Sequence, residues 1–149
     1  MQPSKMRFTV QSESSGGMLA THHTKAGAVV SDEPEGMGGS NRGPNPIEML
    51  LASWAGCLVA SARIVGQERG LELGRMRADA EAEIDPRSLQ GDRSATAGIL
   101  SAKAHLRISG HVPNPDWLKQ EIEARCPVGQ TLRRTGIPFE EDIQLDSLQ

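Results

Sequence analysis

Two cysteines are the residues of this sequence whose chemistry stands out. Cys57 lies in the apolar stretch GPNPIEMLLASWAGCLVASAR, residues 43–63, and Cys126 lies in ARCPVGQTL. The thiolate is the reactive form of cysteine, and an ordinary thiol is only about 3% ionised at pH 7. Burial disfavours the thiolate further, so a reactive Cys57 requires a cation or hydrogen-bond donors nearby. The alternative is that both thiols are inert, because cysteine also packs as a small apolar side chain.

The cysteine spacing argues against a metal site and against a standing disulfide. The two residues are 69 positions apart and form no CxxC pair, the spacing typical of zinc ligands. His22 and His23 are adjacent on a predicted strand, so they point to opposite faces and cannot share a metal ion. The N-terminal residues MQPSKMRFTV lack an apolar signal core, which predicts a cytoplasmic location where thiols stay reduced. We therefore expect no metal and no cofactor.

Composition favours a single globular domain spanning residues 1–149. Hydrophobic residues make up 37% of the chain, which also holds 16 glycines, within the usual globular range. The formal net charge of -3 gives no electrostatic basis for binding nucleic acid. The charge-free part of the apolar stretch, residues 49–62, is shorter than the roughly 20 residues of a membrane span. We expect a buried helix there, and no membrane partner.

The helix that carries Cys57 has a well-defined start. Asn45 is a good N-cap, Pro46 suits the first helical position, and Glu48 falls at the third, which is the spacing of a capping box. Apolar residues then occur on most faces as far as about Arg69, which predicts a helix buried nearly all round. Gly70 is its natural end.

Alternating apolar and polar residues predict strands on both sides of this helix. Residues 6–10 form a first strand, and residues 18–31 form two short strands after a glycine turn. Residues 31–46 are rich in Gly, Pro, Asp and Asn and predict a loop. Residues 75–85 and 100–108 form two long strands, each with one polar and one apolar face, as in antiparallel sheets.

A second helix begins near Asp116, and two placements of Cys126 relative to it stay open. Leu118, Ile122 and Cys126 lie four residues apart, so Cys126 fits the apolar stripe of that helix. Alternatively, Pro127 opens a short helix and Cys126 is its N-cap, where amide groups would stabilise a thiolate.

Residues 137–146 close the chain as a strand. Its inward positions are apolar: Ile137, Phe139, Ile143 and Leu145. The order of strands, helix, strands, helix and strand predicts an α+β domain.

Two segments together resemble the osmotically inducible protein C and organic hydroperoxide resistance family, OsmC/Ohr. They are DEPEGMGGSNRGPNPIEMLLASWAGCL and, far downstream, ARCPVGQTL. The shared features are an Asn-Pro helix start, a cysteine eleven residues after that proline, and a second cysteine in a Cys-Pro-Val context. The resemblance runs from about residue 15 to the end. It implies an OsmC-like fold, in which antiparallel sheets wrap around two main helices of an intertwined homodimer.

The resemblance also implies a chemistry for the two thiols. Cys57 would be the redox-active residue that attacks an organic hydroperoxide and becomes a sulfenic acid. Cys126 would condense with it to a disulfide, which an external dithiol, often lipoyl-linked, reduces. The chain would then be a peroxiredoxin-like peroxidase, an oxidoreductase of the oxidative stress response.

The chain departs from the family's peroxidases at two positions. Met18 follows the glycine turn where they carry an arginine, and Ile47 follows the Asn-Pro where they carry a glutamate that pairs with it. These differences place the chain in a divergent OsmC-like branch. Arg42 is the nearest cation before the helix and a candidate replacement, although a solvated loop charge is the simpler interpretation.

Two further residues near Cys57 have candidate supporting roles. Glu48 lies nine residues before Cys57, which puts it on the opposite helix face, and its capping role already explains it. Trp54 lies one turn before Cys57 on the same face and would give the thiol an apolar surround, or simply fill the core.

The competing hypothesis is a non-catalytic protein. In that case the chain is a dimeric stress-associated protein that binds a small apolar ligand at its interface. The missing arginine and the displaced glutamate motivate this alternative.

Overall fold

A computed structural model describes residues 4–146 of the chain, which form two compact units. The first unit extends to residue 49 and the second begins at residue 50, within the first turn of a long helix. A single domain spanning residues 1–149 stays a prediction.

The first unit contains a three-stranded antiparallel sheet in the order β1–β2–β3. Its strands are β1 (Gln11–Glu13), β2 (Ala20–Thr24) and β3 (Gly27–Ser31). The prediction of two short strands within residues 18–31 is confirmed. The predicted strand at residues 6–10 is wrong, because β1 begins at Gln11, opposite His23, and β2 ends one residue later at Thr24. Only Thr24 of β2 remains opposite the earlier segment, which is too little for a strand pairing, and the apolar side chains of that segment are exposed.

A buried aspartate organises the loop that leads to the long helix. Asp32 is 1% exposed and accepts hydrogen bonds from the Ser40 hydroxyl at 2.5 Å and from the backbone N–H groups of Glu33, Ser40 and Arg42. The Ser40 hydrogen bond is the main reason that the pKa of Asp32 is lowered to about 2. A 3₁₀ turn, η1 (Glu35–Met37), lies inside this loop.

The long helix α1 (Pro46–Glu68) begins with the predicted capping box. The Asn45 side chain accepts from the Glu48 N–H at 2.8 Å, and the Glu48 carboxylate accepts from the Asn45 N–H at 2.8 Å. Gly70, with a φ of 63°, lies just beyond its end as expected.

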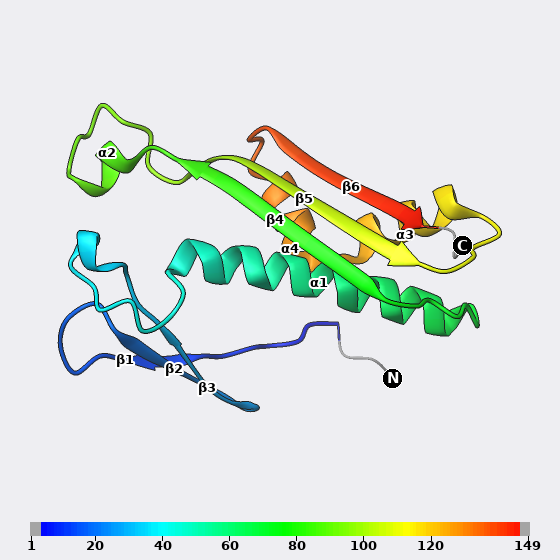
Figure 1. Ribbon diagram of the computed structural model, residues 1–149, viewed down its shortest axis with the longest axis horizontal. Coiled ribbons are helices and arrows are strands. Elements are labelled where there is room, and N and C mark those ends of the chain that lie inside the picture. Colours follow the sequence, from blue (N-terminus) through cyan, green and yellow to red (C-terminus); the bar gives the residue numbers. More distant parts are fainter. Residues whose placement is uncertain (1–3, 147–149) are drawn as a thin grey trace. The chain divides into compact units, whose positions relative to one another are not determined.

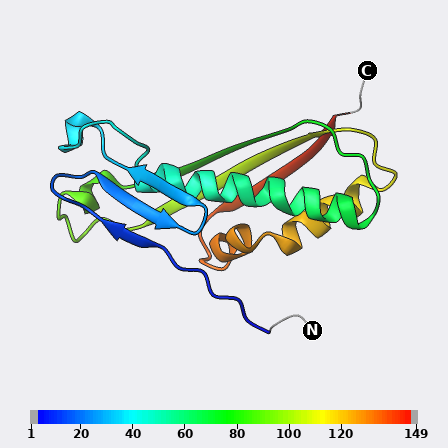
Figure 2. The same ribbon diagram turned by 90° about the horizontal axis from the view of Figure 1, so that it is seen from below.

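The second unit packs helices on one face of a second three-stranded sheet (Figures 1 and 2). The sheet has the order β4–β5–β6, and the elements are β4 (Met76–Ile84), α2 (Pro86–Leu89), β5 (Ile99–Ser109), α3 (Pro115–Arg125), α4 (Pro127–Arg133) and β6 (Phe139–Asp146). The fold class is α+β, as predicted. Strands β4 and β5 are antiparallel, but β5 and β6 are parallel, because α3 and α4 form the crossover between them.

The core lies between the sheet and one face of α1. Four buried α1 residues point toward the sheet: Trp54, Leu58, Ala62 and Val65. Ala102 and Ala104 of β5 are 4% and 1% exposed, and their small side chains leave room for the helix.

The opposite face of α1 is exposed. The expectation that the helix is buried nearly all round is therefore wrong for the single chain that the structure describes. This face carries Ala52, Gly56, Ala60 and Ile64 at four-residue spacing. By length and composition α1 also qualifies as a membrane span, a property that core helices share, and 33% of its most apolar window is buried in this fold.

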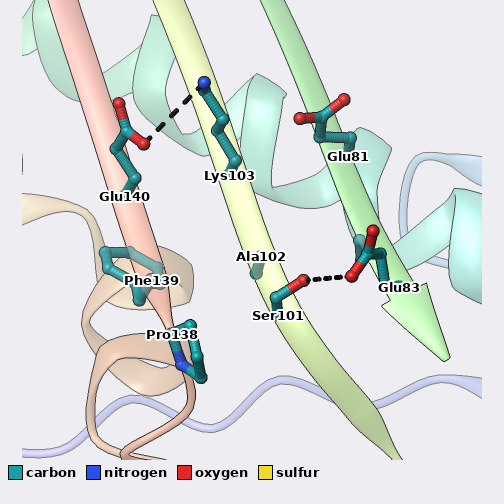
Figure 3. A pocket seen from close by; sticks show the side chains of 9 residues that line it. Glu81, Glu83, Ser101, Ala102, Lys103, Pro138, Phe139 and Glu140 are labelled. Atoms are coloured by element: carbon teal, nitrogen blue, oxygen red, sulfur yellow. Dashed lines mark hydrogen bonds and ion pairs between the residues drawn. The ribbon is translucent and has the colours of Figure 1, made fainter.

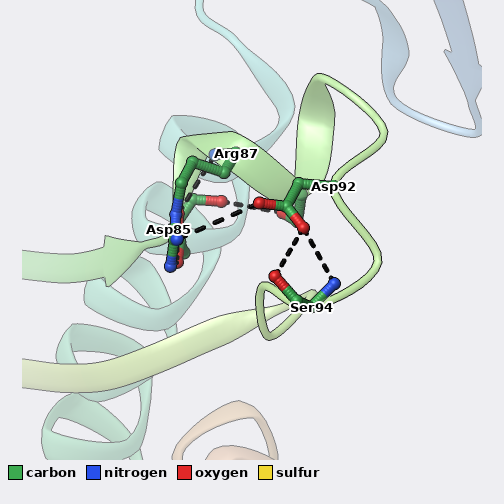
Figure 4. A network of polar contacts seen from close by, with 5 residues as sticks. Asp85, Arg87, Asp92 and Ser94 are labelled. Atoms are coloured by element: carbon green, nitrogen blue, oxygen red, sulfur yellow. Dashed lines mark hydrogen bonds and ion pairs between the residues drawn. The ribbon is translucent and has the colours of Figure 1, made fainter.

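The connection between β4 and β5 is a loop held by polar contacts (Figure 4). Asp85 caps α2 by accepting from the Arg87 N–H at 3.0 Å, and the Arg87 guanidinium lies 3.9 Å from Asp92. Asp92 also accepts from the N–H and the hydroxyl of Ser94. These contacts shape a segment that sequence alone predicts only as a loop.

Leu58→Ala tests the α1 packing. The side chain is 1% exposed, so its truncation leaves a cavity and we expect a loss of about 2–5 kcal/mol in the free energy of unfolding, measured by urea denaturation. Leu89→Ala is the matched control, because Leu89 is 62% exposed and its truncation changes stability by about 0.5 kcal/mol at most. Equal losses for the two variants would contradict the described core.

Candidate active site

The two thiols lie near each other in the second unit. Cys57 is half-buried on α1, and Cys126 is fully buried between α3 and α4. Cys57 packs against the core that contains Cys126, and it is close enough to raise the pKa of the Cys126 thiol. The fold therefore brings together two cysteines that are far apart in the sequence.

Cys126 is the N-cap of α4. Its backbone leaves the helical conformation after Arg125, and its sulfur accepts a hydrogen bond from the Gly129 N–H at 3.4 Å. The structure thus selects the cap over the alternative in which Cys126 continues the preceding helix. Burial, followed by the neighbouring Cys57 thiol, raises the pKa of Cys126 well above its usual range, and the Gly129 N–H opposes this only in part. Cys126 is therefore a protonated thiol at neutral pH.

Glu141 on β6 is a buried carboxylate that the sequence reasoning missed. Its side chain is 0% exposed, and its Oε2 accepts a hydrogen bond from the Trp54 indole N–H at 2.8 Å. Arg133 Nη2 lies 3.5 Å from Oε1 as an ion pair outside hydrogen-bond geometry, so Oε1 has no hydrogen-bond donor in the described structure. Burial raises the pKa of Glu141, opposed by the Trp54 hydrogen bond and the Arg133 charge.

The alternation of β6 contains the signal for this residue. Phe139 and Ile143 are inward, so Glu141 between them has to be inward as well. A charge at a core position is rare unless it is paired, and it marks a place to look for function.

Gly129 leaves the space in which these groups meet. The point where a β-carbon of residue 129 would stand lies 2.5 Å from Glu141 Oε2, 3.1 Å from Trp54 Nε1 and 3.2 Å from Cys126 Sγ. A larger residue would displace at least one of the three. We call Cys57, Cys126, Trp54, Arg133 and Glu141 the thiol–carboxylate cluster.

Aromatic contacts hold the cluster in place. Trp54 is fully buried and stacks on Phe139, with ring centroids 5.2 Å apart. The Arg133 guanidinium lies 4.8 Å from the centroid of the same Phe139 ring, which fixes the cation beside Glu141. Trp54 is therefore both a core residue and a hydrogen-bond donor.

The other two predicted supporting residues belong to the first unit. Arg42 is exposed, and its backbone N–H donates to Asp32. Glu48 is exposed and closes the helix cap. Their positions relative to the thiols, and any role in catalysis, stay predictions.

The second unit also has a pocket of about 580 Å³ on the outward face of its sheet (Figure 3). Four of its polar side chains form two pairs: Lys103 lies 3.8 Å from Glu140, and the Ser101 hydroxyl donates to Glu83 at 3.1 Å. Neither cysteine lines it. Across residues 4–146, no group of three or more His, Cys, Asp or Glu side chains is arranged to hold a metal ion.

Residues 38–142 match the family model described as OsmC-like protein. A segment of 44 residues, 29% of this chain, is 41% identical to an uncharacterized protein of Haloferax volcanii and spans 33% of that relative's length.

Solved structures of low sequence identity share the fold. An OsmC-like protein from Mycoplasma pneumoniae is 14% identical with a TM-score of 0.72, and the alignment covers 97% of this chain and 99% of that one. An organic hydroperoxide resistance protein from Elizabethkingia anophelis is 18% identical with a TM-score of 0.68, covering 97% and 99%. The organic hydroperoxide resistance protein OsmC from Legionella pneumophila is 16% identical with a TM-score of 0.59, covering 95% and 99%.

Trp54→Phe tests the hydrogen bond to the buried carboxylate. The variant leaves a buried acceptor without its donor, so we expect a loss of about 1–3 kcal/mol in the free energy of unfolding at pH 7. The Trp54 hydrogen bond favours the ionised form, and its loss raises the pKa of Glu141 further. The loss should therefore grow as pH rises from 4 to 8, because the raised pKa makes ionisation in the folded state more costly.

The control for this test is the same Trp54→Phe change in a Glu141→Gln background. There the loss should not vary with pH, since the ionisable group is gone and only the smaller ring remains. A loss of equal size at pH 4 and pH 8 in the wild-type background would refute the assignment.

Proposed function

Because the chain belongs to the OsmC-like protein family, we propose that it is a thiol-dependent peroxidase that reduces organic hydroperoxides in oxidative stress defence. The observation that carries the proposal is that the fold brings Cys57 and Cys126 to the same part of the core, near enough for Cys57 to raise the pKa of Cys126. The fold shared with two organic hydroperoxide resistance proteins supports it.

The exposure of the two thiols supports an order in which Cys57 reacts before Cys126. Cys57 is half-buried and meets the hydroperoxide first, whereas Cys126 is fully buried behind it. The Cys57 thiolate attacks the terminal peroxide oxygen, the O–O bond breaks, and the alkoxide leaves as an alcohol after taking a proton. Cys126 then attacks the Cys57 sulfenic acid, forming the S–S bond and releasing water. An external dithiol, for which a lipoyl-linked group is the family's usual choice, reduces the disulfide.

The surroundings of Cys57 favour an organic rather than an inorganic peroxide. Cys57 packs against the apolar core, as does Leu50 two turns earlier on the same face of the helix. An apolar substituent on the hydroperoxide would be buried against these side chains, which stabilises its bound form. Met18 and Ile47 stand where the family's peroxidases carry an arginine and a glutamate. The cation within the thiol–carboxylate cluster is Arg133, which pairs with Glu141.

We expect two thiols per chain to disappear together when the reduced protein meets a few equivalents of cumene hydroperoxide without oxygen. Cys57→Ser should abolish the loss, because no sulfenic acid forms. Cys126→Ser should accumulate a sulfenic acid at Cys57, detected by a 1,3-dione adduct in mass spectrometry. Unchanged thiols in excess peroxide would instead favour the non-catalytic protein that binds a small apolar ligand.

The proposed active form is a cytoplasmic homodimer with neither nucleic acid nor a membrane as partner. The exposed face of α1 is apolar and made mostly of small residues, Ala52, Gly56 and Ala60, which allow a second helix to approach closely. Exposed apolar side chains of the first unit, including Phe8 at 84% exposure, add surface that a second chain would cover.

Gly56→Glu tests this dimer. A β-carbon at residue 56 meets nothing within 4 Å in one chain, so the substitution harms only a contact with a partner. We expect wild-type protein at twice the chain mass by light scattering, and Gly56→Glu at the chain mass. Gln67→Glu is the control, because it adds the same charge at an exposed position near the end of the helix and should leave the dimer intact. Arg63 is not used, because its side chain donates to backbone carbonyls. A monomeric wild-type protein would contradict the dimer.

A further inference from the structure

Glu141 is a charged side chain at a core position that the two-thiol reaction described above does not use. The carboxylate is 0% exposed, and its Oε1 lacks a hydrogen-bond donor in the part of the chain that the structure describes. Burying a carboxylate for stability alone is costly, and an apolar side chain of similar volume would serve the core as well or better. Its presence therefore calls for a chemical explanation.

The neighbour that needs a proton acceptor is Cys126. Its thiol has to lose a proton before its sulfur can attack, and burial holds that proton on the sulfur. Glu141 Oε2 and Cys126 Sγ both lie within 3.2 Å of the point where a Gly129 β-carbon would stand, so they share one small space. The carboxylate is the acceptor placed there, because Arg133 and the Trp54 N–H can only donate.

We propose that Glu141 accepts the proton of Cys126 as this thiol attacks the oxidised sulfur of Cys57. The proposal rests on the proposed function for the order of attack, Cys57 first and Cys126 second. In the step, the S–H bond of Cys126 breaks and its proton moves to the Glu141 carboxylate. The S–S bond forms, the S–O bond of the Cys57 sulfenic acid breaks, and the departing hydroxide leaves as water with the proton from Glu141. Cys126 sulfur is oxidised, Cys57 sulfur is reduced, and Glu141 returns to its carboxylate form.

The charges around Glu141 suit an acceptor that works near neutral pH. Arg133 on α4 favours the carboxylate, whereas Glu123 on α3 and burial favour the carboxylic acid. Ala104, the register partner on β5, carries no charge, and Trp54 on α1 donates its hydrogen bond to the carboxylate. Burial raises the pKa of Glu141, which makes it a stronger base than a surface carboxylate.

The test uses Ellman's reagent, so it needs no peroxide. One equivalent reacts with Cys57 of the fully reduced, full-length protein, which releases one coloured thiolate and leaves a mixed disulfide. Cys126 then attacks the Cys57 sulfur and releases the second thiolate. The second phase reports the attack by Cys126, and Cys126→Ser should lack it.

Glu141→Gln is the main variant, because glutamine keeps the size of the side chain and an acceptor for the Trp54 N–H. We expect the second phase to be about 100-fold slower at pH 7 with the first phase unchanged, the usual size of a general-base effect. In wild type the second-phase rate should be independent of pH once the pH exceeds the pKa of Glu141. In Glu141→Gln it should rise about tenfold per pH unit, because only the spontaneous thiolate then attacks.

Glu140→Gln is the matched control. Glu140 is the neighbouring glutamate on the same strand, but it faces outward and its side chain is 61% exposed. Both phases of this variant should follow wild type at every pH. Equal second-phase rates in Glu141→Gln and Glu140→Gln at pH 7 would overturn the proposal, as would a wild-type protein that shows no second phase.

Arg133→Gln keeps the proposal testable if Glu141→Gln does not fold. Arg133 is 46% exposed, and its removal takes away the charge that favours the carboxylate. The pH at which the second-phase rate becomes flat should therefore rise, and an unmoved profile overturns the proposal. If the protein does not reduce peroxide but keeps a second phase that depends on Glu141, only the proposed function is contradicted. If it reduces peroxide but its second phase does not depend on Glu141, only this inference is contradicted.

Discussion

The packing of one face of α1 against the β4–β6 sheet is the constraint on which the site depends. Trp54 and Leu58 are buried there, and Cys57 lies beside them at the margin of the same face. Because a helix side chain has a fixed direction, burying its neighbours leaves Cys57 half-buried, facing Cys126. The partial exposure of Cys57 and its proximity to the second thiol thus follow from one packing interaction.

The buried charge of Glu141 is the second constraint. Its carboxylate is removed from water, and the Trp54 N–H and the Arg133 guanidinium offset only part of that cost, so the pKa of Glu141 remains raised. Phe139 in turn holds both partners. Its ring stacks with Trp54, and the Arg133 guanidinium lies over the same ring. The cluster is therefore a set of groups that position one another, rather than separate residues.

The cluster also brings together charged side chains from two elements of the second unit. Arg133 of α4 and Glu141 of β6 form an ion pair, and Glu141 lies beside Cys126, in a chain that carries Met18 and Ile47 where the resemblance led us to expect an arginine and a glutamate. The cysteines, the Gly129 space and the α4 cap are the parts of the site that local geometry fixes most tightly.

What the sequence determined by itself were features whose cause is local. The capping box at Asn45, the end of α1 at Gly70 and the alternation of β4 and β5 depend on neighbouring residues, and all are present in the structure. The tertiary structure decided the features that need a partner distant in sequence. Pairing with β2 limits the first strand to residues 11–13, and the α3–α4 crossover makes β6 parallel to β5.

The site divides in the same way. Sequence identified both cysteines and Trp54, because residue types and motif spacing are visible in one dimension. It left open whether Cys126 was a cap, and it passed over Glu141, although the strand alternation already placed that residue inward. Whether an inward glutamate is paired, and what it faces, depends on which side chains surround it after folding, and only three-dimensional packing brings Trp54, Arg133 and Cys126 to that point.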